Sequence, residues 1–563
     1  MNCGTMLNAY PDSMGGTLKD IVEMLSLDAF RGAFRSFYIL PSVFNTDLDR
    51  GFSVISYDLN RELTTEEDMP RLRALGLDLK LDFILNHLSV LSPQFQDILQ
   101  HGDASPCRDF FIDWNRFWSG HGAMTSAGYI QPDESSLREM FFRKPGLPLL
   151  MVRFPDGKEV PFWNTFYQQV HYDLPDAQDL MHLMNLQFGT AEKLARLIAE
   201  EIGGGKKPGE IDFSAFFSPA EAARLLSWLE SRRKYLGQMD LNIRSPLVWE
   251  YYGKVLDQLA AYGAAIVRLD AFGYASKIPG RKNFMNDPET WQILERIRVM
   301  AEERGLTLLP EIHAAYSEGS YRTLAEKGYM TYDFFLPGLL IDALENHNPA
   351  DLIRWAREQK QNDIRCVNML GCHDGIPMLD LKGMIPDERI QQLIDLIVSR
   401  GGLIKNLHGK KNLYYQVNAT YFSALGADER KMLLARALQL FMPGKPQIWY
   451  LDLFAGENDL EAVRQGGEAA HKEINRTNLT KAEMERRLRL PLVQKQLELL
   501  KMRNCCEAFG FDAHLQIEQA GESVIRFCWT KEGKQALLEA DLSTFRFSIQ
   551  ADLPDRAFHF EQQ

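Results

Sequence analysis

The chain has 563 residues, 45% of them hydrophobic and 25% charged, which is enough for one large core and one or two smaller appended domains. Its formal net charge of -13 and its pI of about 5.5 disfavour binding to nucleic acid or to an anionic membrane, because an acidic surface repels phosphate groups. Composition and charge therefore favour a globular protein that acts on a small molecule.

Short apolar, β-rich runs recur along the chain between longer amphipathic stretches. This rhythm predicts βα units around a parallel sheet, and the fold class that we expect is α/β with a (β/α)8 TIM barrel. The runs expected to form strands are residues 6–10, 36–40, 79–85, 265–270, 306–312, 364–370 and 447–450. In a barrel the carboxyl ends of the strands meet at one mouth, so the polar residues that end these runs should lie together.

Two regions interrupt the rhythm before the fourth strand. Residues 88–170 are aromatic-rich and loop-like, and we expect them to form a domain inserted after the third strand. Residues 171–237 have helical patterning and are expected as an extra helical insertion. Within them, Ser218-Pro219-Ala220-Glu221 has the form of a capping box with proline at the first helical position.

The remaining segments belong to the barrel and to a C-terminal domain. Residues 1–87 are expected to supply the first part of the barrel and residues 238–505 the remainder. Residues 506–563 alternate apolar and polar side chains, as half-buried antiparallel strands do. They predict a small C-terminal antiparallel β-domain.

Cysteine usage and the N-terminus indicate a compartment. The seven cysteines are an odd number without CxxC spacing, so reduced thiols are expected rather than a disulfide framework or a zinc site. The first residues lack the basic and apolar regions of a signal peptide, and no later stretch is apolar enough to span a membrane. We expect a soluble, cytoplasmic protein.

Two carboxyl groups stand at the ends of neighbouring predicted strands. Asp270 follows Arg268 by two residues, so on a strand both side chains point the same way and the guanidinium could hold the carboxylate ionised. Glu311 follows an apolar run, which would raise its pKa and keep a proton available. Two carboxyls about 5 Å apart suit cleavage of a glycosidic bond with retention of configuration. A strand-end ion pair or a structural Glu would give the same local patterns.

Two further segments carry polar groups. His373 and Asp374 precede Gly375, which permits an unusual backbone turn, and an anion there could stabilise positive charge on a sugar ring. Asn86 and His87 end the third predicted strand. Alone, the first segment is more often a turn and the second more often holds a satisfied core histidine.

Taken in order, the segments DFILNH, VRLDAFGY, LLPEIH and GCHDG resemble the four signature segments of the α-amylase superfamily, glycoside hydrolase family 13. The segments YPDSMGGTLKDI, DRGFSVISYD, PGKPQIWYLDLFAGENDLE and EINRTN are similar to its sucrose phosphorylase branch, which includes enzymes for sucrose 6'-phosphate, glucosylglycerol and glucosylglycerate. This resemblance spans nearly the whole chain apart from the insertion before QMDLNIRSP.

The resemblance implies a role for each matching residue. It makes Asp270 the nucleophile, Glu311 the general acid/base and Asp374 the stabiliser of the transition state. The residues implied to hold the glucosyl unit are Asp49, Phe52, His87, Phe166, Arg268, His373 and Arg476. Phosphate replaces water as the acceptor in this branch, and the residues implied to bind it are Lys144, Tyr274, His313, Tyr415 and Gln416. A packed aromatic with a polar neighbour, or a solvated surface lysine, would look the same.

The substrate is harder to assign, because the chain has LGCHDG, INRT and GRKNFM where the branch usually has LDTHDG or LDCHDG, INRH and a GTSCFF-like stretch. Tyr415-Gln416 favours sucrose, whereas Lys405, His408, Lys410 and Lys411 would suit a phosphorylated leaving group. We expect phosphorolysis of sucrose to α-D-glucose 1-phosphate and fructose. Sucrose 6'-phosphate, glucosylglycerol and glucosylglycerate are the alternatives.

No cofactor is implied. Some hydrolytic relatives bind calcium through the Asn of the first motif, here Asn86, but the sequence has no acidic cage and we expect no essential metal. The expected partners are a small α-glucoside and inorganic phosphate, with a homodimer possible. A hydrolase or transglucosidase on the same scaffold, and a non-catalytic barrel subunit, are the rival hypotheses.

Overall fold

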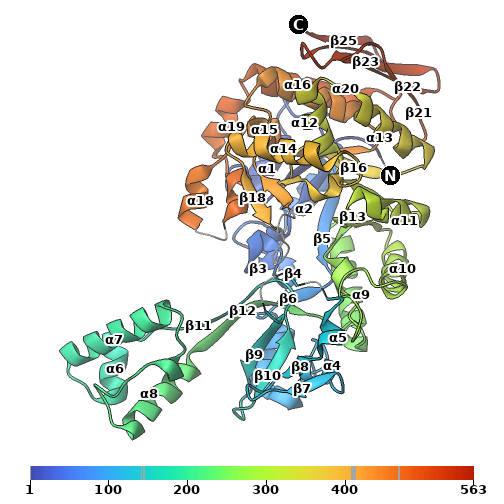
Figure 1. Cartoon of the computed structure of the whole chain (residues 1–563). Coiled ribbons are helices and arrows are strands. Elements are labelled where there is room, and N and C mark those ends of the chain that lie inside the picture. The colour runs from blue at the N-terminus through green and yellow to red at the C-terminus, as the bar shows by residue number, and fades with distance from the viewer. Residues whose placement is uncertain (1, 141, 144–145, 407–413, 467–469) are drawn as a thin grey trace. The chain divides into compact units, whose positions relative to one another are not determined.

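The computed structural model describes residues 2–140, 142–143, 146–406, 414–466 and 470–563 (Figure 1). Eight parallel strands form a near-closed barrel in the order β14-β13-β5-β2-β1-β20-β16-β15. Their bounds are β1 Met6–Ala9, β2 Ser36–Ile39, β5 Asp78–Ile84, β13 Ala264–Asp270, β14 Thr307–Pro310, β15 Thr331–Asp333, β16 Cys366–Met369 and β20 Lys445–Trp449. The predicted α/β barrel is therefore confirmed.

Seven of the barrel strands coincide with the predicted runs, and the sequence analysis missed β15. This strand has only three residues and ends in the fully buried Asp333. The Asp333 carboxylate accepts hydrogen bonds from the indole of Trp355 and the amide of Gln359, each at 2.9 Å. A three-residue strand that ends in aspartate does not appear as an apolar run in the sequence. The aspartate can be buried only because Trp355 and Gln359, which are distant in sequence, hydrogen-bond to it.

Amphipathic helices alternate with the strands and bury one face against them. The helices between barrel strands, and after the last one, include α1 Leu18–Leu25, α2 Asp68–Ala74, α9 Pro246–Ala261, α10 Glu289–Glu302, α11 Ser320–Glu326, α12 Leu336–Asn346, α13 Ala350–Gln361, α14 Asp387–Ser399, α16 Glu429–Phe441 and α20 Pro491–Cys505. α12 and α16 are buried along nearly their whole length.

Small sheets carry loops that follow barrel strands. The hairpin of β3 (Phe44–Thr46) and β4 (Val54–Leu59) follows β2 and encloses the 3-10 turn η2 (Asp49–Gly51). The sheet β17-β19-β18 consists of Ile376–Pro377, Tyr414–Asn418 and Leu403–Asn406 and follows β16. Both extend the chain beyond the carboxyl ends of strands, where a barrel places its functional groups.

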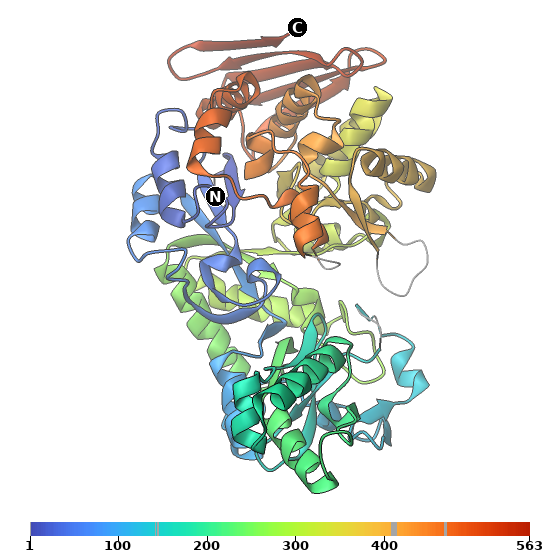
Figure 2. The ribbon, with the colours of Figure 1, turned by 90° about the vertical axis from the view of Figure 1, so that its left-hand side faces the viewer.

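The C-terminal residues form the predicted antiparallel sheet, in the order β21-β22-β23-β24-β25. Its strands are His514–Gln519, Val524–Lys531, Lys534–Asp541, Arg546–Asp552 and Ala557–Gln562. The sheet is the red layer in Figure 2, and the Trp529 indole joins it to the barrel by donating to the Phe441 carbonyl at the end of α16, at 2.8 Å.

Residues 88–133 and 146–240 form a compact unit of their own, while residues 134–145 group with the barrel. The unit contains the hairpins β7–β8 (Gly122–Met124, Ile130–Pro132) and β9–β10 (Leu149–Arg153, Glu159–Trp163), and the helices α3 Pro93–His101, α4 Trp114–Phe117, α6 Ala177–Met184, α7 Phe188–Gly203 and α8 Pro219–Ser231. α6, α7 and α8 bury a common apolar core.

The structure corrects the edges of the predicted helical segment. β11 (Gln168–Tyr172) pairs antiparallel with β12 (Arg233–Asp240), so the residues at both ends of the segment are strand rather than helix. The pairing joins residues that lie more than 60 positions apart, which local periodicity cannot reveal. The capping box is confirmed, because Glu221 accepts from the Ser218 backbone amide at 2.9 Å and from its hydroxyl at 2.7 Å.

None of the helices in the described part of the chain is long and apolar enough to cross a membrane.

The core of the three-helix module gives a first prediction. Leu194 on α7 is fully buried, so Leu194→Ala removes packing and should destabilise the module by about 2–5 kcal/mol. Amide hydrogen exchange over α7 should accelerate in this variant. Phe188→Ala on the same helix is the control, since Phe188 is 58% exposed and should have little effect. Faster exchange in the control than in Leu194→Ala would contradict this assignment of the core.

Candidate active site

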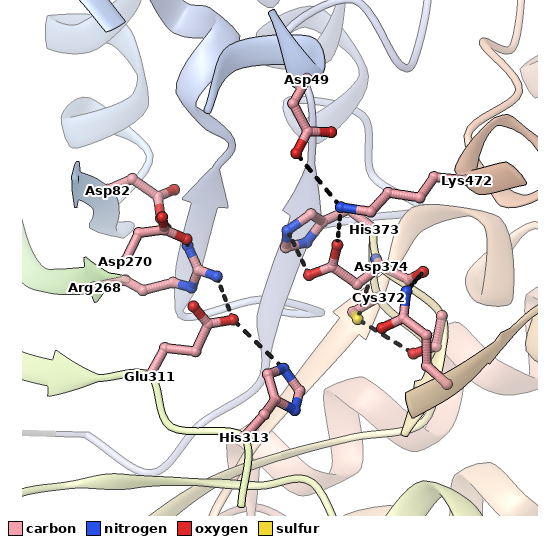
Figure 3. A network of polar contacts seen from close by, with 12 residues as sticks. Asp49, Asp82, Arg268, Asp270, Glu311, His313, Cys372, His373, Asp374 and Lys472 are labelled. Atoms are coloured by element: carbon pink, nitrogen blue, oxygen red, sulfur yellow. Dashed lines mark hydrogen bonds and ion pairs between the residues drawn. The ribbon is translucent and has the colours of Figure 1, made fainter. Parts of the chain in front are cut away.

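A network of charged side chains gathers at the carboxyl ends of the barrel strands (Figure 3). Asp270 is the last residue of β13, and Glu311 directly follows β14. Asp374 lies in the loop after β16, and Asp49 lies in η2 beyond β2. The barrel therefore brings together four carboxyl groups from segments that are far apart in the sequence.

Arg268 lies at the centre of one half of this network. Its Nη1 is 3.0 Å from Asp270 Oδ1, and its Nη2 is 2.6 Å from Glu311 Oε1. Nη1 also donates to Asp82 on β5, which is fully buried. The expected same-side placement of Arg268 and Asp270 is confirmed, and the structure adds that one guanidinium serves three carboxyl groups.

The charges of Asp270 and Glu311 are distributed differently from what the sequence predicts. Burial raises the pKa of Asp270 well above its usual value, and the opposing effect of Arg268 does not cancel it. Burial also acts to raise the pKa of Glu311, but Arg268 and His313 outweigh it and lower the pKa. The sequence reasoning was wrong on this point, because it assigned Arg268 to Asp270 alone and considered only the apolar run before Glu311.

Asp374 contacts two cations and a histidine in the other half of the network. Its Oδ1 lies 2.6 Å from Lys472 Nζ and 3.9 Å from Arg476 Nη2, and its Oδ2 lies 3.2 Å from His373 Nε2. Burial would raise the pKa of Asp374, but these three neighbours lower it well below its usual value. Asp374 is therefore ionised at neutral pH.

Lys472 was missed in the sequence analysis. Besides Asp374, it contacts Asp49 at 3.5 Å, and Arg476 approaches the same Asp49 carboxylate at 3.7 Å. Lys472 precedes Arg476 by four residues in HKEINR, so its nearness to the motif could have drawn attention to it. From sequence alone, however, a lysine in such a segment is expected to be a solvent-exposed charge. The two cations and two carboxylates link the loop after β2 to the segment that follows β20.

The Phe52 ring contacts both halves of the network, since the Arg268 guanidinium lies 5.3 Å from its centroid. The Phe52 ring stacks on His373 with centroids 5.0 Å apart and an interplanar angle of 10°. The Phe52 carbonyl lies 2.9 Å from His87 Nε2. Burial lowers the pKa of His373 to about 3, so its imidazole is neutral at neutral pH. Gly375 adopts φ of 135°, which confirms the expected unusual turn.

His313 is the cationic group beside Glu311. Its Nε2 is 3.6 Å from Glu311 Oε1, its Nδ1 is 3.4 Å from Asp380, and its ring stacks on Phe334. Burial lowers the pKa of His313, but Asp380 and Glu311 outweigh burial and raise the pKa to about 10. His313 is therefore positively charged at neutral pH.

The other residues implied to bind phosphate are placed only in part. Gln416 donates through its side-chain amide to the Asp374 carbonyl at 2.9 Å, so it supports the loop that carries Asp374. The Tyr274 hydroxyl accepts from Arg143 at 2.9 Å. Lys144 lies outside the described residues, as does the side chain of Tyr415, and so do the side chains of the basic loop Lys405, His408, Lys410 and Lys411. Phe166 belongs to the second compact unit.

Asn86, the residue linked to calcium in some hydrolytic relatives, accepts from an ammonium group. Lys277 Nζ lies 2.8 Å from Asn86 Oδ1 and 2.6 Å from the Tyr274 carbonyl. Among the residues described, no cluster of three or more His, Cys, Asp or Glu side chains could hold a metal ion. The Lys277 ammonium group thus lies beside the Asn86 oxygen, where a calcium ion would need further oxygen ligands.

Comparisons with known proteins identify close relatives. No family model matches the chain. It is 48% identical over 553 residues to a sucrose 6(F)-phosphate phosphorylase of Ilumatobacter coccineus, covering 97% of this chain and 95% of that protein. It is 27% identical to a sucrose phosphorylase of Streptococcus mutans, covering 99% of each. The crystal structure of sucrose 6F-phosphate phosphorylase from Thermoanaerobacter thermosaccharolyticum matches with a TM-score of 0.80 at 30% identity, covering 100% of this chain and 98% of that one.

The contacts of Lys472 predict a pH-dependent effect on stability. Ionised Asp374, with its lowered pKa, stabilises the folded chain above the unfolded-state pKa of about 3.9, and this contribution is lost as the pH falls further. Lys472→Met raises the pKa of Asp374, so the difference in unfolding free energy from wild type should be larger at pH 6 than at pH 3.5. Urea denaturation at both values measures it.

Lys495→Met, at an exposed position on α20, is the control and should show no such dependence. A difference for Lys472→Met that is equal at the two pH values would contradict the ion pair with Asp374.

Proposed function

Because the chain belongs to the sucrose phosphorylase family of glycoside phosphorylases, a branch of the α-amylase superfamily, we propose that it transfers glucose from sucrose 6'-phosphate to inorganic phosphate. The products would be α-D-glucose 1-phosphate and fructose 6-phosphate. The family predicted from the ordered motifs is confirmed, as is the enzyme class, a hexosyltransferase.

The main support for this substrate is the 48% identity over nearly the full chain to a protein named for sucrose 6(F)-phosphate. Relatives named for sucrose itself are 26–29% identical. The comparison therefore favours the alternative over the sucrose that Tyr415-Gln416 suggested. A phosphorylated leaving group also suits the positive charge of His313, which lies beside Glu311 and is paired with carboxylates.

The proposed reaction is a double displacement. In the first step an Asp270 oxygen forms a bond to the anomeric carbon while the bond to the departing fructosyl oxygen breaks, and Glu311 gives that oxygen its proton. In the second step a phosphate oxygen displaces Asp270 from the anomeric carbon and Glu311 takes the phosphate proton. Glucose 1-phosphate leaves, and both carboxyl groups return to their starting states.

This chemistry needs the proton on Glu311 and the negative charge on Asp270, whereas burial raises the pKa of Asp270 and Arg268 and His313 lower that of Glu311. The two carboxyl groups share Arg268, so they titrate as a coupled pair. Positive charge developing on the anomeric carbon favours ionised Asp270, and a leaving oxygen beside Glu311 favours a protonated acid there. We infer that substrate binding moves the proton from Asp270 to Glu311.

The other half of the network would hold the glucosyl unit. Asp374 is ionised and can stabilise positive charge on the sugar ring in the transition state. Asp49, Lys472 and Arg476 would close the pocket around a terminal glucose, with His87, His373 and Phe52 as further contacts. Lys472 and Arg476 orient the two carboxylates towards the sugar hydroxyls.

Phosphate would enter on the side of His313. The imidazolium beside Glu311 supplies positive charge for an anionic acceptor, and Arg143 offers a second cation next to Tyr274. Lys144, Tyr415 and Gln416 complete the proposed acceptor residues.

We also propose residues 88–170 and 171–237 as insertions in the barrel and residues 506–563 as a separate C-terminal domain.

A panel of donors tests the substrate. Sucrose 6'-phosphate, sucrose, glucosylglycerol and glucosylglycerate are each incubated with and without phosphate, and glucose 1-phosphate and free glucose are measured. We expect phosphate-dependent glucose 1-phosphate, with kcat/KM at least about tenfold higher for sucrose 6'-phosphate than for sucrose, a difference of about 1.4 kcal/mol in transition-state binding. Higher kcat/KM for sucrose would refute the proposed donor. Equal glucose release with and without phosphate would refute phosphorolysis.

Donors with different leaving groups distinguish the proposed roles of Asp270 and Glu311. Asp270→Asn should lose on the order of 10⁴-fold in kcat with every donor, because it removes the nucleophile. Glu311→Gln should lose as much with sucrose 6'-phosphate, but far less with α-D-glucosyl fluoride, since fluoride departs without a proton. If both variants lose activity equally with the fluoride, the acid/base role of Glu311 is wrong.

A further inference from the structure

A buried lysine lies inside the barrel next to the charged cluster. Lys80 on β5 is fully buried, and its Nζ donates to Gln447 Oε1 on β20 at 2.7 Å and to the hydroxyl of Tyr332 on β15. The same Nζ lies 3.8 Å from the ring centroid of Tyr38 on β2. A carbonyl oxygen, a hydroxyl and a ring face all favour a protonated amine, so we treat Lys80 as a cation.

Lys80 is connected to Arg268 through two residues, Tyr38 and Asp82. Lys80 and Asp82 lie two residues apart on β5, so their side chains point to the same side of the strand. Tyr38 contacts both, because its ring faces Lys80 and its hydroxyl donates to Asp82 at 2.8 Å. Asp82 in turn accepts from Arg268, which bridges Asp270 and Glu311. A chain of polar contacts therefore runs from Lys80 to the proposed catalytic pair.

The charges of this cluster balance when Lys80 is included, because the nearby cation His313 has Asp380 as a partner of its own. Asp82, Asp270 and Glu311 are three carboxyl groups, and Arg268 neutralises one of them. With Lys80 as a second cation, the cluster is neutral when two carboxyls are ionised and one is protonated. That is the state that a retaining mechanism requires, with one carboxylate and one carboxylic acid in the pair.

A buried ammonium group is expensive, and an apolar side chain of similar volume would fill the barrel at lower cost. Burial lowers the pKa of Lys80 well below its usual value, and Arg268 adds to this, while Asp82, Glu311 and Cys372 oppose it. The other polar groups that face Lys80 are Tyr38, Tyr332 and Gln447. The cost indicates that the charge serves a purpose other than packing.

We propose that Lys80 is a positioning residue for glucosyl transfer, whose positive charge keeps one of Asp270 and Glu311 ionised at neutral pH and whose contacts hold Tyr38 and Asp82 against Arg268. This proposal rests on the proposed roles of that pair. Without Lys80, neutrality of the cluster would require two protonated carboxyls, and the nucleophile would lose its charge at a higher pH.

The test is the pH profile of kcat/KM with α-D-glucosyl fluoride, a donor whose acidic limb reports ionisation of the nucleophile. In Lys80→Met we expect the acidic limb to move upward by about one pH unit, since a buried cation is lost from the vicinity of the pair. Lys80→Arg keeps the charge, so its acidic limb should stay close to that of wild type.

Lys445→Met is the matched control. Lys445 is a fully buried lysine on β20 that donates to Asn2, and it contacts none of the three carboxyl groups. This variant should lose stability without moving the acidic limb. A limb in Lys80→Met that superimposes on that of wild type would overturn the proposal.

A second variant covers the case in which Lys80→Met does not fold. Tyr38→Phe keeps Lys80 and removes the hydroxyl that donates to Asp82, so Arg268 is drawn further towards Asp82 and the acidic limb should again move upward. An unmoved limb in this variant would also count against the chain of contacts. Wild-type enzyme inactive on both glucosyl fluoride and sucrose 6'-phosphate would instead refute the proposed function.

Discussion

The candidate active site depends on one guanidinium group. Arg268 is almost completely buried and contacts Asp82, Asp270 and Glu311, which come from three neighbouring strands of the barrel. Removing carboxylates from water is costly, and without this cation the three groups would repel one another or take up protons. Arg268 therefore holds the proposed catalytic pair, Asp270 and Glu311, close together and limits the protons that the pair takes up.

A second set of charges depends on loops rather than on strands. Asp49, Asp374, Lys472 and Arg476 lie beyond the strand ends, in segments that follow β2, β16 and β20. Their mutual pairing fixes these loops before a substrate arrives, which lowers the entropy lost on binding. Each charged group also already has a partner, so we expect affinity for the proposed glucosyl unit to depend on how well its hydroxyls reproduce those contacts.

The distribution of charge also explains how an acidic protein can use anionic substrates. A net charge of -13 repels phosphate at long range, yet His313 and Lys472 place positive charge inside the mouth of the barrel. At about 0.1 M salt, repulsion between exposed charges more than about 10 Å apart is largely screened, whereas buried pairs are screened much less. Local cations can therefore dominate once the substrate has entered.

The sequence by itself determined the barrel, seven of its eight strands, the C-terminal sheet and the ordered motifs of the family, because apolar periodicity and strand-end residues are local properties of the chain. Tertiary structure decided the rest. β15 is short and ends in an aspartate that distant side chains satisfy, and β11 and β12 pair across the helices between them. Lys472 belongs to the site only because it forms an ion pair with Asp374, about 100 residues away. The proton shared by Asp270 and Glu311 depends on Arg268, His313 and Lys80 together, and no local pattern records which charges a fold brings within reach of one another.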